Sequence, residues 1–278
     1  MATWGTTIAA STIVVAAFTV ARAQTPVMGA LARIADAGRI RLGYRVDASP
    51  FSYRDDSGGP AGYSIALCQK IADAVKGQLR LPQLAVEWVP VAAPDRFEAV
   101  RRHTLDISCA ADTVSLSRRA RVAFSLPIFP GGIGVLLRSD APQRLKNAVS
   151  GKGQLPFKAL APVPFKDLKI VTTVAPVPTY DAGLNAVVQR DADALFGDRA
   201  VLLDLARRRS DVVVLDRLFT HEPLAFALPA GDEAFRLIVD RTLAHTFTNT
   251  TFSGFYTKWF GEPDESTIAF FRWSAIPD

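Results

Sequence analysis

The sequence predicts an α/β protein, because short apolar segments with strand character alternate with helical patterns along most of its length. RIRLGYR (39–45) and LAVEWVPV (84–91) have the composition and alternation of strands, and GYSIALCQKIADAVK (62–76) between them has the period of a helix. The apolar residues of this helix fall on one face: Ile65, Cys68, Ala72 and Val75. Strands separated by helices favour right-handed crossovers and a mostly parallel sheet with helices on both faces.

The alternation continues to the end of the chain with one interruption. Further strands are expected at 105–110, 121–129, 134–138, 168–177, 192–197, 211–216 and 222–229. Further helices are expected at 94–102, 179–190, 198–209, 232–247, 252–261 and 263–272. Residues 139–167 are rich in proline and lack a clear period, which predicts a loop or an insertion without regular structure.

Composition and charge restrict the class of protein. The chain has 278 residues, of which 49% are hydrophobic and 21% charged, and this is typical of a globular protein with one large or two modest domains. The net charge is +5, and the short basic runs at 101–102 and 207–209 have no aromatic residues interleaved with them. We therefore expect solvated helix ends there and no binding of nucleic acid.

The first residues have the features of a signal peptide. No charged side chain precedes Arg22, residues 8–20 are largely apolar, and ARA (21–23) is a small-x-small cleavage site before Gln24. We therefore expect residues 1–23 to be removed on export to the periplasm. A retained membrane anchor is the alternative interpretation, since about 20 apolar residues span a bilayer.

The chain has two cysteines, Cys68 and Cys109. An exported protein meets an oxidising compartment, where an even pair of cysteines tends to close. Cys68 lies on a predicted helix and Cys109 on a strand of the sheet that this helix covers, so we predict a disulfide between them. Two separate buried thiols are the alternative.

Motifs for catalysis are absent from the sequence. It contains no G-x-S-x-G elbow, no Walker loop and no H-E-x-x-H motif. His103, His221 and His245 lie far apart and share no ligand spacing. We therefore expect no metal, no cofactor and no catalytic residue.

One strand end carries residues that suit a carboxylate. CAADTVSLSRRARVAFSLPIF (109–129) places Thr113 and Arg118 directly after the strand at 105–110. Ligands of α/β proteins bind at the carboxyl ends of parallel strands, and a guanidinium can hold a carboxylate through two hydrogen bonds. The alternative is that Arg118 and Arg119 are solvated surface charges.

This segment and others resemble a known family, the family-3 extracellular solute-binding proteins, which are the periplasmic amino acid-binding proteins of polar amino acid ABC transporters. The first two similar stretches are GYRVDASPFSYRDDSGGPAGYSIALCQKIADAVK and CAADTVSLSRRARVAFSLPIF. YDAGLNAVVQRDADALFGDRAVLLDLA, RLFTHEPLAFALPAGDEAFRLIVDRTL and YTKWFGEP follow in the family's order. The resemblance implies the type II periplasmic-binding fold, with two α/β lobes closing on a ligand.

The resemblance also implies which residues bind. Thr113 and Arg118 match the residues that hold the ligand's α-carboxylate, and Asp198 matches the acid that takes its α-ammonium group. In the acidic amino acid branch two further arginines bind the side-chain carboxylate, and Arg45 and Arg96 occupy those positions. A dicarboxylic ligand, glutamate or aspartate, is therefore implied. The remaining members of the implied site are Ala111 on the strand end and an aromatic wall of Phe51 or Tyr53.

Each assignment has an alternative. Arg45 can instead pair with Asp47, Arg96 can cap or solvate its helix, and Asp198 can serve only as a helix N-cap. The implied hinges fall near 128–133 and 222–227. Lobe 1 is then formed by 24–129 and 227–278, and lobe 2 by 133–222. The implied protein is a monomer that delivers a small amino acid to an inner-membrane ABC transporter permease.

The chain departs from the family in its second lobe. Members carry a Gly-Thr-Thr turn whose backbone N–H groups also hold the ligand carboxylate. No such turn is present, and Thr172-Thr173 lies in the wrong place and lacks the glycine. The second lobe is therefore expected to be truncated. The alternatives to a transport function are a degenerate member that binds nothing, the sensing domain of a receptor, and an enzyme on the same fold such as a cyclohexadienyl dehydratase.

Overall fold

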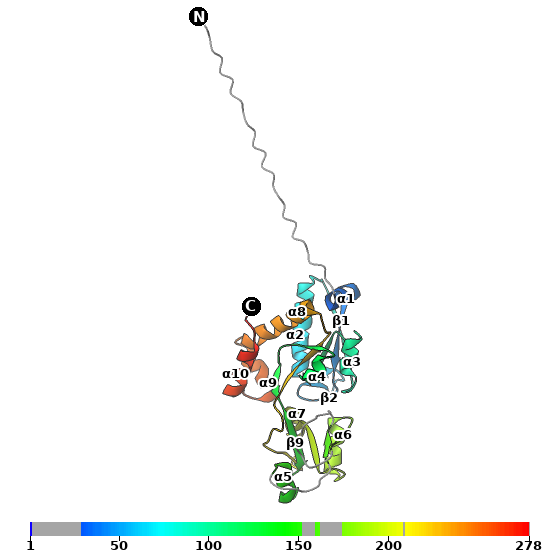
Figure 1. Ribbon diagram of the computed structural model, residues 1–278, viewed down its shortest axis with the longest axis vertical. Helices are drawn as coiled ribbons and strands as arrows, with labels where there is room; N and C mark the ends of the chain where they lie inside the picture. Colours follow the sequence, from blue (N-terminus) through cyan, green and yellow to red (C-terminus); the bar gives the residue numbers. More distant parts are fainter. Residues whose placement is uncertain (2–28, 152–158, 162–173, 208, 278) are drawn as a thin grey trace.

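The computed structural model shows two α/β lobes stacked along the long axis of the molecule (Figure 1). Its described residues are 1, 29–151, 159–161, 174–207 and 209–277. Residues 2–23 of the predicted signal peptide lie outside these ranges. Among the helices within them, none has the length and apolar character needed to cross a membrane.

The sheet of the first lobe has six strands in the order β5-β1-β6-β14-β7, with β8 also paired to β14. These strands are β1 (Arg39–Tyr44), β5 (Ala85–Pro90), β6 (Ile107–Thr113), β7 (Ala123–Phe124), β8 (Phe129–Gly131) and β14 (Glu222–Leu228). β1 runs parallel to β5 and β6, whereas β14 runs antiparallel to β6, β7 and β8. The sheet is therefore mixed rather than mostly parallel, because β14 returns from the second lobe in the opposite direction.

Helices cover this sheet (Figure 1). They are α1 (Ala30–Ala37), α2 (Tyr63–Gln78), α3 (Arg96–Arg101), α4 (Leu116–Arg119), α8 (Glu233–Thr248), α9 (Phe252–Phe260) and α10 (Glu265–Ser274). The sequence patterns did not predict α1, a short helix that ends at Gly38 in the left-handed conformation. They also missed a small sheet of β2 (Asp47–Ala48), β3 (Ser52–Arg54) and β4 (Pro60–Ala61), whose strands are too short to show a period.

The second lobe contains a five-stranded sheet in the order β11-β10-β12-β9-β13. Its strands are β9 (Ile133–Arg138), β10 (Ala159–Ala161), β11 (Val174–Pro176), β12 (Ala194–Asp198) and β13 (Val212–Val214). The helices α5 (Gln143–Val149), α6 (Tyr180–Val188) and α7 (Arg199–Ala206) pack with it. β10 is parallel to β11 and β12, and β9 is antiparallel to β12 and β13.

The segment 139–167 was expected to lack regular structure, and this expectation was wrong. It contains α5 and β10. The helix starts directly after Pro142, a position where the missing N–H of proline costs nothing, and it buries Leu145, Ala148 and Val149. Their helical spacing is present in the sequence, but the prolines around it hid the pattern. Thr172 and Thr173 lie outside the described residues.

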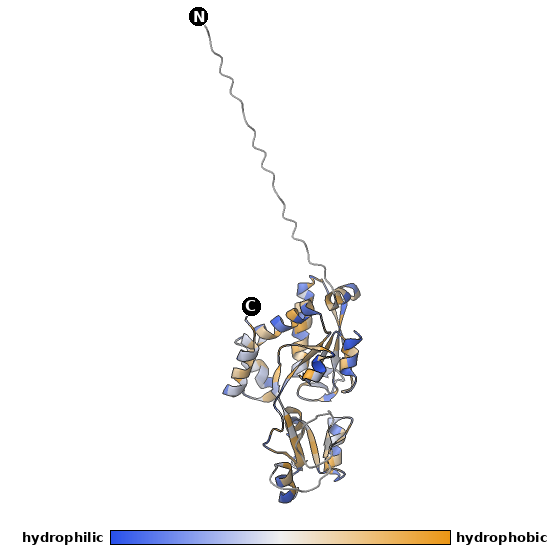
Figure 2. Ribbon diagram, viewed as in Figure 1, coloured by the Kyte–Doolittle hydropathy of each residue, from blue (hydrophilic) through white to orange (hydrophobic). Residues whose placement is uncertain are grey.

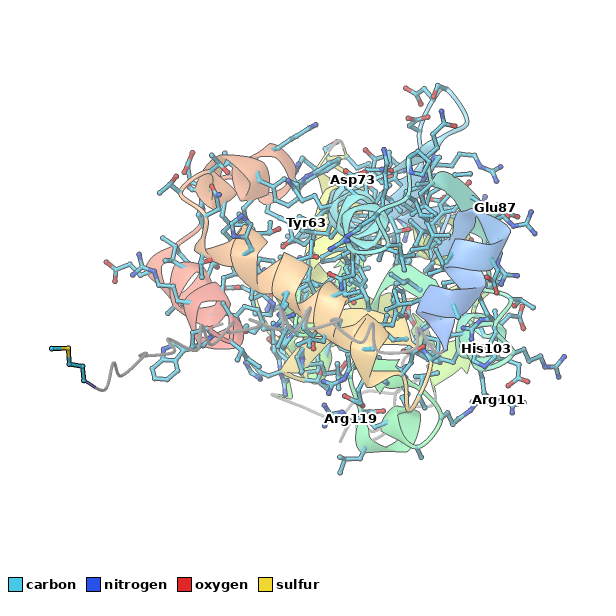
Figure 3. The ribbon with its side chains drawn as sticks, turned by 90° about the horizontal axis from the view of Figure 1, so that it is seen from above. Tyr63, Asp73, Glu87, Arg101, His103 and Arg119 are labelled. Atoms are coloured by element: carbon cyan, nitrogen blue, oxygen red, sulfur yellow. A yellow bond between two sulfur atoms is a disulfide. The ribbon has the colours of Figure 1, made fainter. Side chains whose placement is uncertain are left out.

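Apolar residues are concentrated on the strands and on the inner helix faces of each lobe (Figure 2). Aromatic rings fill the space between the lobe 1 core, strand β8 and the C-terminal helices. The rings of Phe51 and Phe129 lie 4.9 Å apart, and those of Phe129 and Phe260 4.7 Å apart. Viewed down the long axis, the charged residues Glu87, Arg101 and Arg119 lie at the periphery (Figure 3).

The predicted disulfide is present between Cys68 on α2 and Cys109 on β6. Both side chains are completely buried. The bond links α2 to the central strand of the sheet and closes a loop with a sequence separation of 41 residues.

Removing this bond should destabilise the folded protein. The Cys68→Ala/Cys109→Ala variant frees the unfolded chain from the loop constraint, so we expect its free energy of unfolding to fall by about 3–4 kcal/mol. Urea unfolding of the variant and the wild type measures the difference, and wild-type protein treated with a reductant serves as a matched control. Equal stability of all three samples, or two free thiols in alkylated wild-type protein, would contradict the assignment.

Candidate functional site

The candidate site lies between the carboxyl ends of β1 and β6 in lobe 1 and the start of α6 and end of β12 in lobe 2. A cavity of about 30 Å³ is enclosed there. It is lined by Arg45, Ala48, Phe51, Arg96, Ala110, Ala111, Asp112, Thr113, Arg118, Tyr180, Asp198 and Val201. A cavity of this size holds on the order of one or two water molecules, and an amino acid needs more room than that between the lobes.

A bulge at the end of β6 shapes one wall of the cavity. β6 pairs with β14 at Thr113 and Asp112 and again at Ser108, but the register shifts between them. Ala111 lies in this bulge with a φ of 55°, a left-handed conformation that is uncommon for a residue other than glycine. The Ser108 hydroxyl donates to Asp112 across the bulge at 2.8 Å. The bulge therefore fixes the direction of the Asp112 carboxylate.

Asp112 faces Arg96, and the two form a buried ion pair. Their side chains are only 2% and 7% exposed. The Arg96 Nε donates to the Asp112 carboxylate, and another guanidinium nitrogen donates to the Ala93 carbonyl. The Arg96 guanidinium also lies over the Phe97 ring, 4.4 Å from its centre. Arg96 is thus held by partners on its own lobe rather than exposed to solvent at its helix.

Arg45 forms a second pair, with Asp47. Its Nε and Nη2 donate to the two carboxylate oxygens at 2.8 Å each. The same carboxylate accepts a hydrogen bond from the backbone N–H of Tyr180 at 3.2 Å, at the N-terminus of α6 in the other lobe. The Arg45 guanidinium lies 5.4 Å from the centre of the Tyr180 ring. Arg45, Asp47 and Tyr180 therefore form a contact between the lobes.

Arg118 differs from these two arginines. It lies on the short helix α4, whose N-cap Ser115 accepts a hydrogen bond from the Arg118 N–H. Its Nη1 donates to the carbonyl of Thr113 at 2.6 Å, and its guanidinium lies 5.3 Å from the centre of the Phe97 ring. It forms no ion pair with any described residue. Burial lowers the pKa of Arg118 from its ordinary value and the nearby charge of Arg96 lowers it further, while the charges of Asp112 and Glu222 act in the opposite direction.

Asp198 presents the opposite charge from lobe 2. Its backbone N–H donates to the Tyr180 hydroxyl at 3.1 Å, but its Oδ1 is buried and has no hydrogen-bond partner among the described residues. Burial raises the pKa of the carboxyl to about 7, with a further contribution from Glu222, while Arg45 lowers it. Asp198 precedes α7, yet its side chain makes no capping hydrogen bond. The capping alternative is therefore not supported.

The seven residues that the sequence implied as a ligand site all line this one cavity. Phe51 is 1% exposed and belongs to the aromatic cluster, whereas Tyr53 is not among the lining residues. Sequence reasoning missed Asp112 and Tyr180 as parts of the wall. Asp112 was hidden because strand alternation does not anticipate a bulge, and Tyr180 because its helix comes from the other lobe.

A larger cavity of about 740 Å³ lies between α7 and the C-terminal helices. It also touches Asp198, and its other lining residues are Pro50 and members of α7, α9, α10 and the two segments that connect the lobes, 129–132 and 218–223. We place the site in the smaller cavity, because the buried Arg45 and Arg96 and the half-buried Arg118 converge there. In the described ranges no group of His, Cys, Asp and Glu side chains is arranged to hold a metal ion.

Comparison with known proteins agrees with this architecture. A family model for bacterial extracellular solute-binding proteins, family 3, matches residues 40–262. The chain belongs to this family. A solved relative, an ancestral amino acid-binding protein described as a precursor of cyclohexadienyl dehydratase, superimposes with a TM-score of 0.70 at 25% identity, covering 84% of this chain and 100% of that one. The fold of this family member is therefore the two-lobed type II periplasmic-binding fold.

Two curated relatives are similar over most of their length. The L-glutamate/L-aspartate-binding protein of Pseudomonas aeruginosa is 30% identical, and the match covers 84% of this chain and 81% of the relative. The glutamate/aspartate import solute-binding protein of Salmonella typhimurium is 26% identical, with coverage of 84% and 80%.

The raised pKa of Asp198 predicts a dependence of stability on pH. Below the pKa of an unfolded Asp, about 3.9, the carboxyl is protonated in both states. From there to about 7 the unfolded chain releases the proton first, so the stability contributed by this group is lost as the pH rises. The Asp198→Asn variant cannot ionise, and we expect it to exceed the wild type in stability at pH 8 by on the order of 2 kcal/mol.

At pH 4 the two proteins should unfold together. Thermal unfolding at both pH values measures the difference, and Asp191→Asn, at an exposed position on the same lobe, is the matched control. A constant gap between Asp198→Asn and wild type at the two pH values would contradict the assigned protonation.

Proposed function

We propose that this protein is the periplasmic substrate-binding component of an amino acid ABC importer, and that one amino acid binds between its lobes. The observation that supports this most directly is a guanidinium and an ionisable carboxyl in one cavity, neither of them in an ion pair. Arg118 from lobe 1 and Asp198 from lobe 2 both line it, and neither forms an ion pair with a described residue. The ligand's α-carboxylate would bind Arg118 and its α-ammonium group Asp198.

Family membership supports the transport role. The relatives described above are named for binding and importing amino acids, and the proposed site uses the groups that all amino acids share. Those relatives are named for glutamate and aspartate, so the acidic amino acids and their amides are the ligands to compare. Export to the periplasm through the predicted signal peptide, delivery to an inner-membrane permease and a monomeric state belong to the same proposal.

Opening and closing would occur at the two strands that connect the lobes. β8 and β14 pair antiparallel, with Glu222 opposite Gly131 and Leu224 opposite Phe129. A Cβ atom on Gly132 would lie 2.3 Å from the carbonyl oxygen of Thr220, so the two connections approach closely there. We propose hinges at 128–133 and 222–227. Lobe 1 would comprise 24–129 and 227–278, and lobe 2 133–222. A closed, ligand-bound form would be recognised by the transporter.

Removing the Arg118 guanidinium should abolish most of the affinity. A ligand carboxylate would remain buried without a counter-charge, so we expect Arg118→Ala to weaken binding at least about a hundredfold, or ~2.7 kcal/mol. A thermal-shift screen of the twenty amino acids identifies a ligand. Calorimetric titration of that ligand then compares the variant with wild type and with Arg119→Ala, which changes the exposed neighbour at the molecule's periphery (Figure 3). Equal affinity of Arg118→Ala and wild type would disprove the carboxylate assignment.

One observation favours a second candidate, a dehydratase acting on a cyclic carboxylate. Asp198 is a carboxyl with a pKa near neutrality in a cavity with three arginines, which is the arrangement that a general acid requires. The solved relative described as a precursor of cyclohexadienyl dehydratase points the same way. Incubation with a cyclohexadienyl carboxylate, followed by NMR, tests it. For a binding protein we expect no turnover, whereas turnover that Asp198→Asn abolishes would establish the enzyme.

A further inference from the structure

The charges in the candidate cavity are not equivalent. Three guanidiniums line it, those of Arg45, Arg96 and Arg118. Two of them already have a carboxylate partner within the protein, Asp47 for Arg45 and Asp112 for Arg96. Of the charged groups that line it, only Arg118 and Asp198 lack an ion-pair partner among the described residues, and the nearby Glu222, which is not a lining residue, acts on both through its charge. A zwitterion with an uncharged side chain would neutralise those two charges and leave none over.

Each of the two internal pairs is held in place by further contacts. The Asp112 carboxylate is aimed by the β6 bulge and accepts from Ser108, while Arg96 is also bound to the Ala93 carbonyl. The Asp47 carboxylate is bound by both Arg45 nitrogens and by the N–H of Tyr180. Their side chains are at most 10% exposed. Separating either arginine from its carboxylate is therefore costly in free energy, because water does not readily replace the lost contact.

We propose that Asp47 and Asp112 determine the ligand class, making the cavity selective for amino acids with uncharged side chains over glutamate and aspartate. This inference rests on the proposed function. A second ligand carboxylate would have to displace Asp47 or Asp112 from its arginine, or lie beside it as a like charge. Both are unfavourable where water is excluded, because breaking a buried pair leaves a charge uncompensated.

The same pairing disfavours a cationic side chain. A lysine ammonium would need a carboxylate as its partner, and the arginines already occupy Asp47 and Asp112, which leaves Glu222, outside the cavity lining, as the remaining carboxylate near Arg118 and Asp198. Glutamine and glutamate are the appropriate test ligands, because they differ in the charge of the side chain but hardly in its size. Asparagine and aspartate form a second matched pair, and lysine is the cationic comparison.

Calorimetric titration of the full-length mature protein with these ligands tests the proposal. We expect wild type to bind glutamine at least tenfold more tightly than glutamate. Asp112→Asn and Asp47→Asn each leave an arginine free for a ligand carboxylate, so each should shift the ratio of the two affinities at least tenfold toward glutamate. Asp73→Asn removes the same charge from an exposed position on α2, and it should leave the ratio unchanged.

A double variant keeps the test decisive if an unpaired arginine prevents folding. Arg96→Gln/Asp112→Asn removes both charges of one pair, and we expect it to keep the wild-type preference for glutamine. Tighter binding of glutamate than glutamine by the wild type would overturn the inference while leaving the proposed function intact. The inference would also be overturned if the double variant lost affinity for glutamate but not for glutamine. A wild type that binds no amino acid at all would overturn both.

Discussion

A guanidinium is costly to remove from water unless an anion accompanies it, and the cleft of this protein brings three guanidiniums together. Much of the local structure places carboxylates beside these guanidiniums. The β6 bulge turns Asp112 toward Arg96, and β2 holds Asp47 against Arg45. Arg118 receives only a carbonyl oxygen from within the protein. Two of the three guanidiniums are thus neutralised by carboxylates of the protein itself. Arg118 on lobe 1 and the ionisable carboxyl of Asp198 on lobe 2 have no such partner among the described residues.

The Arg45–Asp47 ion pair also forms part of the contact between the two lobes. Asp47 and Arg45 belong to lobe 1, but both reach Tyr180 at the N-terminus of α6 in lobe 2. The Tyr180 hydroxyl in turn accepts from the backbone of Asp198. A helix N-terminus favours an adjacent carboxylate, so Asp47 helps hold the lobes together when the cleft is shut. With these contacts formed, the cavity between the lobes measures about 30 Å³, and the paired strands β8 and β14 connect the lobes.

The rigid part of the molecule lies behind this cleft. The disulfide fixes α2 to the strand that ends in the bulge, and the aromatic cluster around Phe51 and Phe129 packs the C-terminal helices against the hinge. Phe51 lines the cavity at the same time, so the candidate site shares a wall with the lobe 1 core. A site built on such a scaffold can keep its arginines in place while the second lobe moves.

The sequence alone determined the α/β class, the order of most helices and strands, the cysteine pair and the family. These features depend on local periodicity and on motifs such as DTVSLSR and DALFGD, which are continuous segments of the sequence. It also implied the seven residues that converge on the cavity. It could not place α5, whose spacing is obscured by nearby prolines, or the short strands β2 to β4. Nor could it decide whether Arg45 and Arg96 are free to bind a ligand. The tertiary structure decided that, because the β6 bulge and the docking of α6 determine which carboxylates face these arginines. Side chains brought together by a bulge and by two separate lobes leave no periodic pattern in the sequence.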